Sequence, residues 1–155
     1  MRIRALILPL ALVLAGCATS NLREDPGAGD LMELRKEAAR VYQEHEYAKA
    51  LPLYQALVER VPNDPYLWFR LGNVQAYLKQ PDPAIAAYRE AVRLSPKMDK
   101  AWHNMAILYL RQAANSLTQM LQHTDPKGAL YPKAVQLSDG VIQLLEHRDG
   151  PQDAQ

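Results

Sequence analysis

The sequence predicts an all-α protein in which helix pairs stack along the chain as a short α-solenoid. The first observation behind this prediction is an internal repeat, in which similar residues recur every 34 positions. The second is a run of apolar residues at helical spacing near the C-terminus. The third is the composition, because 48% of the 155 residues are hydrophobic and 23% are charged, as in a soluble globular domain.

The repeat is visible as six sets of residues that recur after 34 positions. They are Leu34, Trp68 and Trp102; Ala38, Gly72 and Ala106; Ala50 and Ala84; Tyr54 and Tyr88; Val58 and Val92; and Pro62 and Pro96. We expect the small residues to lie where a partner helix crosses closely, Gly72 above all. We expect the prolines to end each unit, because proline cannot continue a helix. Asn63 and Asp64 then supply a capping residue for the next helix.

The second unit carries a recognisable motif. It reads Trp68-x-x-Leu71-Gly72, then Ala84-x-x-x-Tyr88, then Pro96, and it resembles the tetratricopeptide repeat. Gln75 stands where that pattern has a tyrosine. The resemblance implies about two and a half to three helix-turn-helix repeats, with a domain over residues 31–132 divided into 31–64, 65–98 and a degenerate 99–132.

The third unit departs from the pattern after its first helix. Thr118 and Gln122 replace the alanine and the aromatic residue of a second helix, and the stretch 125–128 (Asp-Pro-Lys-Gly) predicts a loop. We therefore expect one helix over about 100–122 and a last, capping helix over 132–147. The apolar face of that last helix is predicted from Ala134, Leu137, Val141, Leu144 and Leu145. Residues 148–155 are predicted to be a disordered tail.

The stretch 1–16 predicts an export signal, with Arg2 and Arg4 ahead of an apolar run that ends in small residues. The 12-residue run over 5–16 is about 18 Å long as a helix, too short for a bilayer core of roughly 30 Å. The stretch 17–30 contains glycine and proline without hydrophobic periodicity, and it predicts a flexible tether.

The single cysteine lies at the end of this signal. Leu14-Ala15-Gly16-Cys17 resembles the lipobox of bacterial lipoproteins, which implies cleavage before Cys17 and lipidation of its thiol and new amino terminus. Ala18 follows where an aspartate would favour retention in the inner membrane. For a Gram-negative host the resemblance thus implies a lipid anchor in the outer membrane, facing the periplasm.

Composition and motifs argue against several classes of function. Eighteen Lys and Arg against 17 Asp and Glu leave a net charge of +1. Nucleic-acid-binding domains are strongly basic, so this charge argues against nucleic acid as a partner. One cysteine excludes an intramolecular disulfide and a Cys-rich metal site. The four histidines match no metal pattern, and the chain has no P-loop or nucleophile elbow. We therefore expect no catalysis, no cofactor and no metal.

A binding role is favoured by the first helices of the repeats, which line the concave face of such arrays. Their exposed positions predict a basic, aromatic groove for a peptide, made of Arg35, Tyr42, Tyr66, Phe69, Arg70, Asn73, Tyr77, Lys100, His103 and Asn104. Arg35, Lys100 and Asn104 partly resemble the carboxylate clamp of some tetratricopeptide domains. Ala39 and Arg70 stand where that clamp has asparagine. The alternative is an ordinary solvated face, or one covered by the C-terminal helix.

The favoured function is a protein-interaction scaffold or assembly factor for an envelope complex of pilus or secretion type, with a protein or peptide partner. One alternative is an adaptor that regulates a periplasmic protease or a peptidoglycan enzyme. The other is a self-associating structural protein, a homo-oligomer whose groove is filled by its own C-terminal helix. The small size of the array favours either a stabilising cap or a partner.

Overall fold

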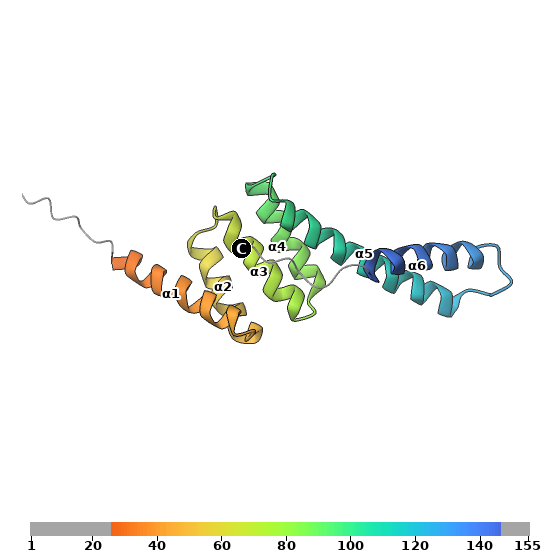
Figure 1. Cartoon of the computed structure of the whole chain (residues 1–155), viewed down its shortest axis with the longest axis horizontal. Helices are drawn as coiled ribbons and strands as arrows, with labels where there is room; N and C mark the ends of the chain where they lie inside the picture. Colours follow the sequence, from red (N-terminus) through yellow and green to blue (C-terminus); the bar gives the residue numbers. More distant parts are fainter. Residues whose placement is uncertain (1–25, 147–155) are drawn as a thin grey trace, which may run out of the picture.

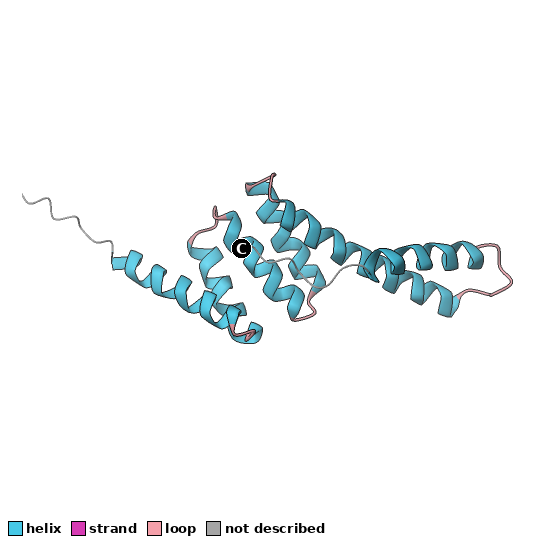
Figure 2. Ribbon diagram, in the orientation of Figure 1, coloured by secondary structure: helices cyan, strands magenta, loops and turns pink. Residues whose placement is uncertain are grey.

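The computed structural model describes residues 26–146, with side chains described from residue 29 onward. Six helices and no strand occur in that range (Figures 1 and 2). The helices are α1 (Pro26–Gln43), α2 (Tyr47–Arg60), α3 (Pro65–Tyr77), α4 (Pro81–Leu94), α5 (Asp99–His123) and α6 (Tyr131–Glu146). The all-α prediction is confirmed. The predicted signal over 1–16, the lipidated Cys17 and the tail over 148–155 lie outside the described residues.

The helices form a stack in which each packs against the next, from α1 and α2 through α3 and α4 to α5 (Figure 1). The two turns inside the first two pairs are built alike. His45 and Lys79, at equivalent positions of successive repeats, both have φ of 59°. The amide of the residue after each turn donates back to the preceding helix, from Glu46 to Val41 and from Gln80 to Gln75. This geometry reverses the chain after α1 and again after α3.

Prolines and one aspartate set the helix boundaries. The helices α2 and α4 end two residues before Pro62 and Pro96, as predicted from the repeat. The helix α3 begins with Pro65. Proline has no backbone N–H, but at the first helical position that group has no acceptor within the helix, so no hydrogen bond is lost. The carboxylate of Asp64 accepts hydrogen bonds from the amides of Tyr66 and Leu67, so the predicted cap is confirmed.

The described core consists of two clusters. One gathers buried residues of α1, α2 and α3, and the other gathers those of α3, α4 and α5. Trp68 packs against both clusters, and its indole N–H donates to the carbonyl of Pro62 at 2.8 Å. The equivalent Trp102 makes the same contact with Pro96 at 3.0 Å, but its side chain is 48% exposed. Trp68 therefore packs between the two clusters, whereas about half of the Trp102 side chain is left exposed.

Gly72 lies where α3 and α4 cross. A Cβ built there would lie 2.6 Å from two ring carbons of Tyr88, which is itself fully buried. The close approach expected from the repeat is therefore confirmed, since only a residue without a side chain fits against that ring.

The helix α5 continues beyond the repeats and forms a hairpin with α6. All buried residues of α5 lie within 101–108, and among residues 109–146 only Ala134 and Ser138 are buried. The helix α6 packs against the second half of α5, and the hairpin projects away from the first four helices (Figure 1). Leu137 and Leu144, predicted to lie on its packed face, are exposed, because α5 covers only the part around Ala134 and Ser138.

The predicted tether over 17–30 is too long at its C-terminal end. The helix α1 begins at Pro26, so residues 26–30 are already helical. Proline at the first helical position is favourable because its φ suits the helix. An ion pair between Asp30 and Arg60 also connects this end of α1 to the end of α2.

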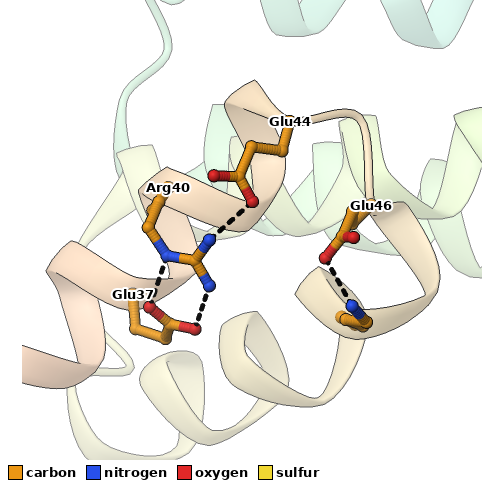
Figure 3. Close-up of polar contacts among 5 residues, drawn as sticks. Glu37, Arg40, Glu44 and Glu46 are labelled. Atoms are coloured by element: carbon orange, nitrogen blue, oxygen red, sulfur yellow. Dashed lines mark hydrogen bonds and ion pairs between the residues drawn. The ribbon is translucent and has the colours of Figure 1, made fainter.

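The outer surface of α1 carries a small charge network (Figure 3). Arg40 donates to Glu37 at 2.8 and 2.6 Å and to Glu44 at 2.6 Å. These hydrogen bonds raise the pKa of Arg40, and the hydrogen bond from Arg40 lowers the pKa of Glu37. At the start of α2, Glu46, the residue just before the helix, pairs with Lys49. These pairs are exposed, so each contributes little to the free energy of unfolding.

Candidate functional site

The most distinctive group on the repeats is Arg70, held by two tyrosines. Its guanidinium carbon lies 4.6 Å from the ring centroid of Tyr42 and 5.0 Å from that of Tyr66, within cation–π range. Its Nε donates to the hydroxyl of Tyr66 at 2.8 Å. We call these three residues, Tyr42, Tyr66 and Arg70, the Arg70 cage. The cage joins α1 to α3 and fixes a guanidinium in one orientation.

The cage changes the acid–base properties of Arg70. Burial lowers its pKa, but hydrogen bonds and charge interactions with Tyr66 and Tyr42 outweigh burial, so that the pKa is raised above the ordinary arginine value. The half-buried guanidinium is therefore cationic at every physiological pH. A planar cation with five N–H donors suits a carboxylate, which it can bind through two parallel hydrogen bonds.

Next to the cage is a hollow of about 280 Å³. Residues of α1, α2 and α3 line it: Arg35, Ala39, Tyr42, Gln43, Tyr54, Leu57, Tyr66, Leu67 and Arg70. Arg35 pairs with Asp64 at 2.9 Å, and both side chains are partly exposed. Two arginines thus line a hollow whose floor is apolar and aromatic. No carboxylate is among the residues that line it.

A buried hydrogen-bond network lies behind the site and connects four helices. The hydroxyl of Tyr88 donates to the Oδ1 of Asn73 at 2.8 Å, and the Nδ2 of Asn104 donates to the same oxygen at 3.0 Å. The Nδ2 of Asn73 donates to the hydroxyl of Tyr42 at 3.4 Å. Both asparagines are buried, so their amides are used inside the protein and do not face a peptide.

The structure separates the predicted groove residues into two groups. It brings Arg35, Tyr42, Tyr66 and Arg70 together around one hollow. Phe69 is 1% exposed and packs in the second core cluster, which corrects the expectation that it lines a groove. The side chain points inward because α4 and α5 cover that side of α3.

The remaining three predicted residues are not among those that line the hollow, although the ring of Tyr77 contacts that of Tyr42 edge-on, with centroids 6.4 Å apart. Tyr77 is half-buried and stacks on Tyr47, with ring centroids 4.1 Å apart and planes 5° apart. Lys100 and His103 are half-buried in the first turns of α5, away from the hollow beside the Arg70 cage. The partial resemblance to a carboxylate clamp therefore does not extend to the geometry, because Asn104 is buried and Lys100 does not line the hollow that Arg35 lines.

Part of the site was not predicted from the sequence. Tyr54 and Leu57 of α2 form part of the hollow, although only first helices were expected to line the groove. Their place in the repeat predicted core positions, and they are buried, but one side of each borders the hollow. Asp64 was predicted as a cap alone. Its ion pair with Arg35 joins two positions far apart in the sequence, and no local pattern in the sequence reports such a contact.

Within residues 26–146 no helix combines the length and the apolar character that a membrane span requires. The same described residues contain no group of three or more His, Cys, Asp or Glu side chains placed to hold a metal ion.

Comparisons with known proteins agree with this architecture. The tetratricopeptide repeat family matches residues 65–98, which contain α3 and α4. A peroxisomal targeting signal receptor of Kluyveromyces lactis is 28% identical over 110 residues, 68% of this chain and 19% of the receptor. The photosystem I assembly protein Ycf3 of Rippkaea orientalis is 32% identical over 102 residues, 64% of this chain and 58% of that protein.

A third relative, superkiller complex protein 3 of Mus musculus, is 34% identical over 74 residues, 48% of this chain and 5% of that protein. The chain thus spans about a fifth of the receptor and somewhat over half of the assembly protein. The match over residues 65–98 coincides with one complete helix pair and with the predicted second repeat. This chain is therefore a tetratricopeptide-repeat-containing protein with an all-α solenoid fold.

Proposed function

We propose that this chain is a non-enzymatic scaffold that binds an acidic segment of another protein beside the Arg70 cage. The observation that carries the proposal is the fixed, cationic Arg70 next to a hollow of about 280 Å³ that a second arginine also lines. Arginine and tyrosine are the residue types that most often supply binding energy at protein interfaces. A carboxylate of the partner would be held by Arg70 while an apolar neighbour enters the hollow.

A second hollow supports an acidic partner. It has a volume of about 300 Å³ and lies where α5 passes the turn between α3 and α4. Its lining residues are Ala76, Lys79, Pro81, Leu108, Arg111, Gln112 and Asn115. Two cations line it and no carboxylate does. The chain thus has two hollows whose linings contain basic and no acidic side chains, although Arg35 at the first is paired with Asp64, and this favours an acidic peptide over a basic one.

The proposal includes a cellular setting. We infer from the signal over 1–16 and from Cys17 that a lipid anchor holds the chain in the outer membrane of a Gram-negative cell, on the periplasmic face. The scaffold would then assist assembly of an envelope complex of pilus or secretion type. Anchoring raises the local concentration of the site near the membrane, so a weak peptide contact suffices there. The relative named an assembly protein supports an assembly role.

Site-specific photo-crosslinking tests the binding proposal. A benzophenone amino acid replaces Ala39, an exposed residue that lines the first hollow, and envelopes are irradiated. We expect a defined crosslinked protein that is lost with Arg70→Gln and retained with Arg89→Gln. Arg89 is the matched control, because its guanidinium also lies over a tyrosine ring and donates to that hydroxyl, but on α4. Equal crosslinking in both variants would contradict the site.

Replacing Cys17 tests the anchor separately. We expect Cys17→Ser to accumulate as an uncleaved precursor that incorporates no labelled fatty acid. Normal processing together with normal retention in the outer membrane would contradict the lipid anchor. Neither result depends on whether the Arg70 cage binds a partner.

A further inference from the structure

Within residues 26–146 the third repeat has the first helix of a pair but no second helix packed beside the start of it. In the first two pairs the chain reverses at His45 and at Lys79, which both have φ of 59°. The equivalent position in the third repeat is Ala113, which lies inside α5, and the helix continues to His123. The helix α6 therefore begins only at Tyr131, and it packs against the second half of α5 (Figure 1).

The displacement of α6 leaves open a face of α5 that is covered on α1 and on α3. Three repeat positions form this face: Leu34, Ala38 and Val41 on α1; Trp68, Gly72 and Gln75 on α3; and Trp102, Ala106 and Tyr109 on α5. On α1 and α3 the first of the three positions is half-buried and the other two are buried. On α5 all three are exposed, with Trp102 at 48% and Tyr109 at 39%. We call Trp102, Ala106 and Tyr109 the open α5 face.

The first two repeats show what covers the equivalent face. Their second helices share an alanine followed four residues later by a tyrosine: Ala50 and Tyr54 in α2, and Ala84 and Tyr88 in α4. The ring of Tyr88 lies against Gly72, where an added Cβ would be 2.6 Å from two ring carbons. In the first repeat Tyr54 is buried in the same core cluster as Ala38. Because Ala38 and Ala106 are both alanine, the first repeat is the closer guide to what fits on the open α5 face.

The described part of the chain supplies no such helix to the open α5 face. The positions of the alanine and the tyrosine are taken in the third repeat by Thr118 and Gln122, which lie inside α5 itself. The two aromatic residues of the face are nevertheless held in place. The indole of Trp102 donates to the carbonyl of Pro96 at 3.0 Å, and the hydroxyl of Tyr109 accepts from Arg89 at 2.6 Å. The face is therefore formed and fixed before anything binds to it, which lowers the entropic cost of binding.

We propose that the open α5 face binds an amphipathic helix of another protein, which takes the place of the missing second helix of the third repeat. The helix that fits runs antiparallel to α5. It presents a small residue beside Tyr109 and, four positions later, an aromatic residue over Ala106, as α2 does toward α1. Recognition of a helix through residues at such spacing is a common mode of peptide binding. The face is separate from the hollow beside the Arg70 cage, so this proposal goes beyond the binding proposed there and does not depend on it.

Two arginine substitutions at equivalent positions test whether the face is open. Ala38→Arg places a charge beneath α2, and we expect it to lower the midpoint of urea unfolding strongly or to prevent folding. Ala106→Arg changes an exposed residue, and we expect the midpoint to stay where it is in the unaltered chain. A loss for Ala106→Arg as large as that for Ala38→Arg would overturn the proposal, because a helix of the chain itself would then already cover the face.

Isothermal titration calorimetry with a helical peptide tests binding to the full-length chain. The probe has the sequence of residues 46–61, which contain α2, and a hydrocarbon staple joins positions 55 and 59, where α2 is exposed. We expect saturable binding of one peptide to each chain. A peptide with Tyr54→Ala is expected to bind at least roughly tenfold more weakly, because it lacks the aromatic ring that covers Ala106.

The same titration with two chain variants locates the binding. Ala106→Arg is expected to weaken binding of the stapled peptide by at least roughly tenfold, because the arginine side chain occupies the space of the helix. Ala48→Arg is the matched control, since Ala48 is an exposed alanine of α2, and we expect no change. Absence of binding to the unaltered chain, or equal binding to both variants, would overturn the proposal.

Two further measurements distinguish other occupants of the face. We expect sedimentation equilibrium to give the mass of one chain. A dimer that dissociates with Ala106→Arg would make a second copy the occupant. Binding to vesicles of phosphatidylethanolamine and phosphatidylglycerol that Trp102→Ala reduces, in a chain that does not bind the stapled peptide, would make a lipid surface the occupant. Either of these results would overturn the proposal.

Discussion

The repeats, residues 31–108, and the hairpin, residues 109–146, are both built from helices, but they bury their apolar side chains to different extents. In the repeats an inner helix such as α3 has neighbours on two sides, and Phe69 and Leu71 on opposite parts of its surface are both buried. In the hairpin α6 packs mainly against one neighbour, α5, and it leaves Leu137 and Leu144 exposed. Two helical segments of this chain can therefore differ in how much of their apolar surface is buried.

The sharpest contrast between the two regions comes from the same substitution made in each. Leu57 is fully buried in the first core cluster, and Leu57→Ala is expected to lower the free energy of unfolding by about 2–5 kcal/mol. Leu137→Ala, at an exposed position, is expected to change it by less than about 0.5 kcal/mol. Urea unfolding measures both. Equal losses would mean that the two regions are equally packed.

Two glycines provide a second matched comparison. Gly72→Ala places a methyl group against the buried ring of Tyr88, and we expect a loss of roughly 1–3 kcal/mol. Gly140 has no atom within 4 Å of an added Cβ and lies inside α6. Gly140→Ala is therefore expected to stabilise the protein by about 0.5–1 kcal/mol through helix propensity. In thermal unfolding the Tm should fall for Gly72→Ala and rise for Gly140→Ala. A Tm that changes in the same direction for both variants would contradict the packing around Gly72.

A smaller effect is expected from the buried network. Tyr88→Phe removes the hydroxyl that donates to Asn73 and leaves the amide oxygen one partner short, at a cost of about 1–2 kcal/mol. Tyr109→Phe removes an exposed hydroxyl that accepts from Arg89, and we expect a change near zero. A large loss for Tyr109→Phe would show that the start of the hairpin is more tightly held than its exposure indicates.

The smallest effect concerns the charges on α1 (Figure 3). Because the pKa of Glu37 is lowered in the folded state, its ionised form stabilises the fold above the unfolded-state pKa, and this contribution is lost as the pH falls through the folded-state pKa. Glu37→Gln should therefore lower the Tm slightly at neutral pH and not at strongly acidic pH. A difference in Tm between the two proteins that does not depend on pH would contradict the ion pair.

Much of the fold was predictable because residues that recur every 34 positions mark the same place in each helix pair. The recurrence predicted the helix pairs, the proline boundaries and the close approach at Gly72, and the structure agrees with all three. The start of α1 was not predicted, because glycines at 27 and 29 indicated a tether. A proline at the first helical position and the contact of Asp30 with Arg60 favour the helix there.

The candidate site was only partly predictable. Periodicity reports which residues share one side of a helix, but not how far the neighbouring helices cover that side. Arg70 and Tyr66 lie at the uncovered part of α3, whereas Phe69 and Asn73 on the same helix are covered by α4 and α5. The cage itself depends on Tyr42, which belongs to the preceding repeat, and such a contact requires the angle between two helices, which the sequence pattern does not contain.

The contacts of Trp68 and Trp102 with the preceding prolines have an optical consequence. These are the two tryptophans of the chain, and each indole spans a junction between one helix pair and the next. Trp68 is half-buried between two core clusters and should emit at shorter wavelength, whereas the more exposed Trp102 should emit at longer wavelength. Single Trp→Phe variants would therefore report separately, by intrinsic fluorescence, on the opening of each junction.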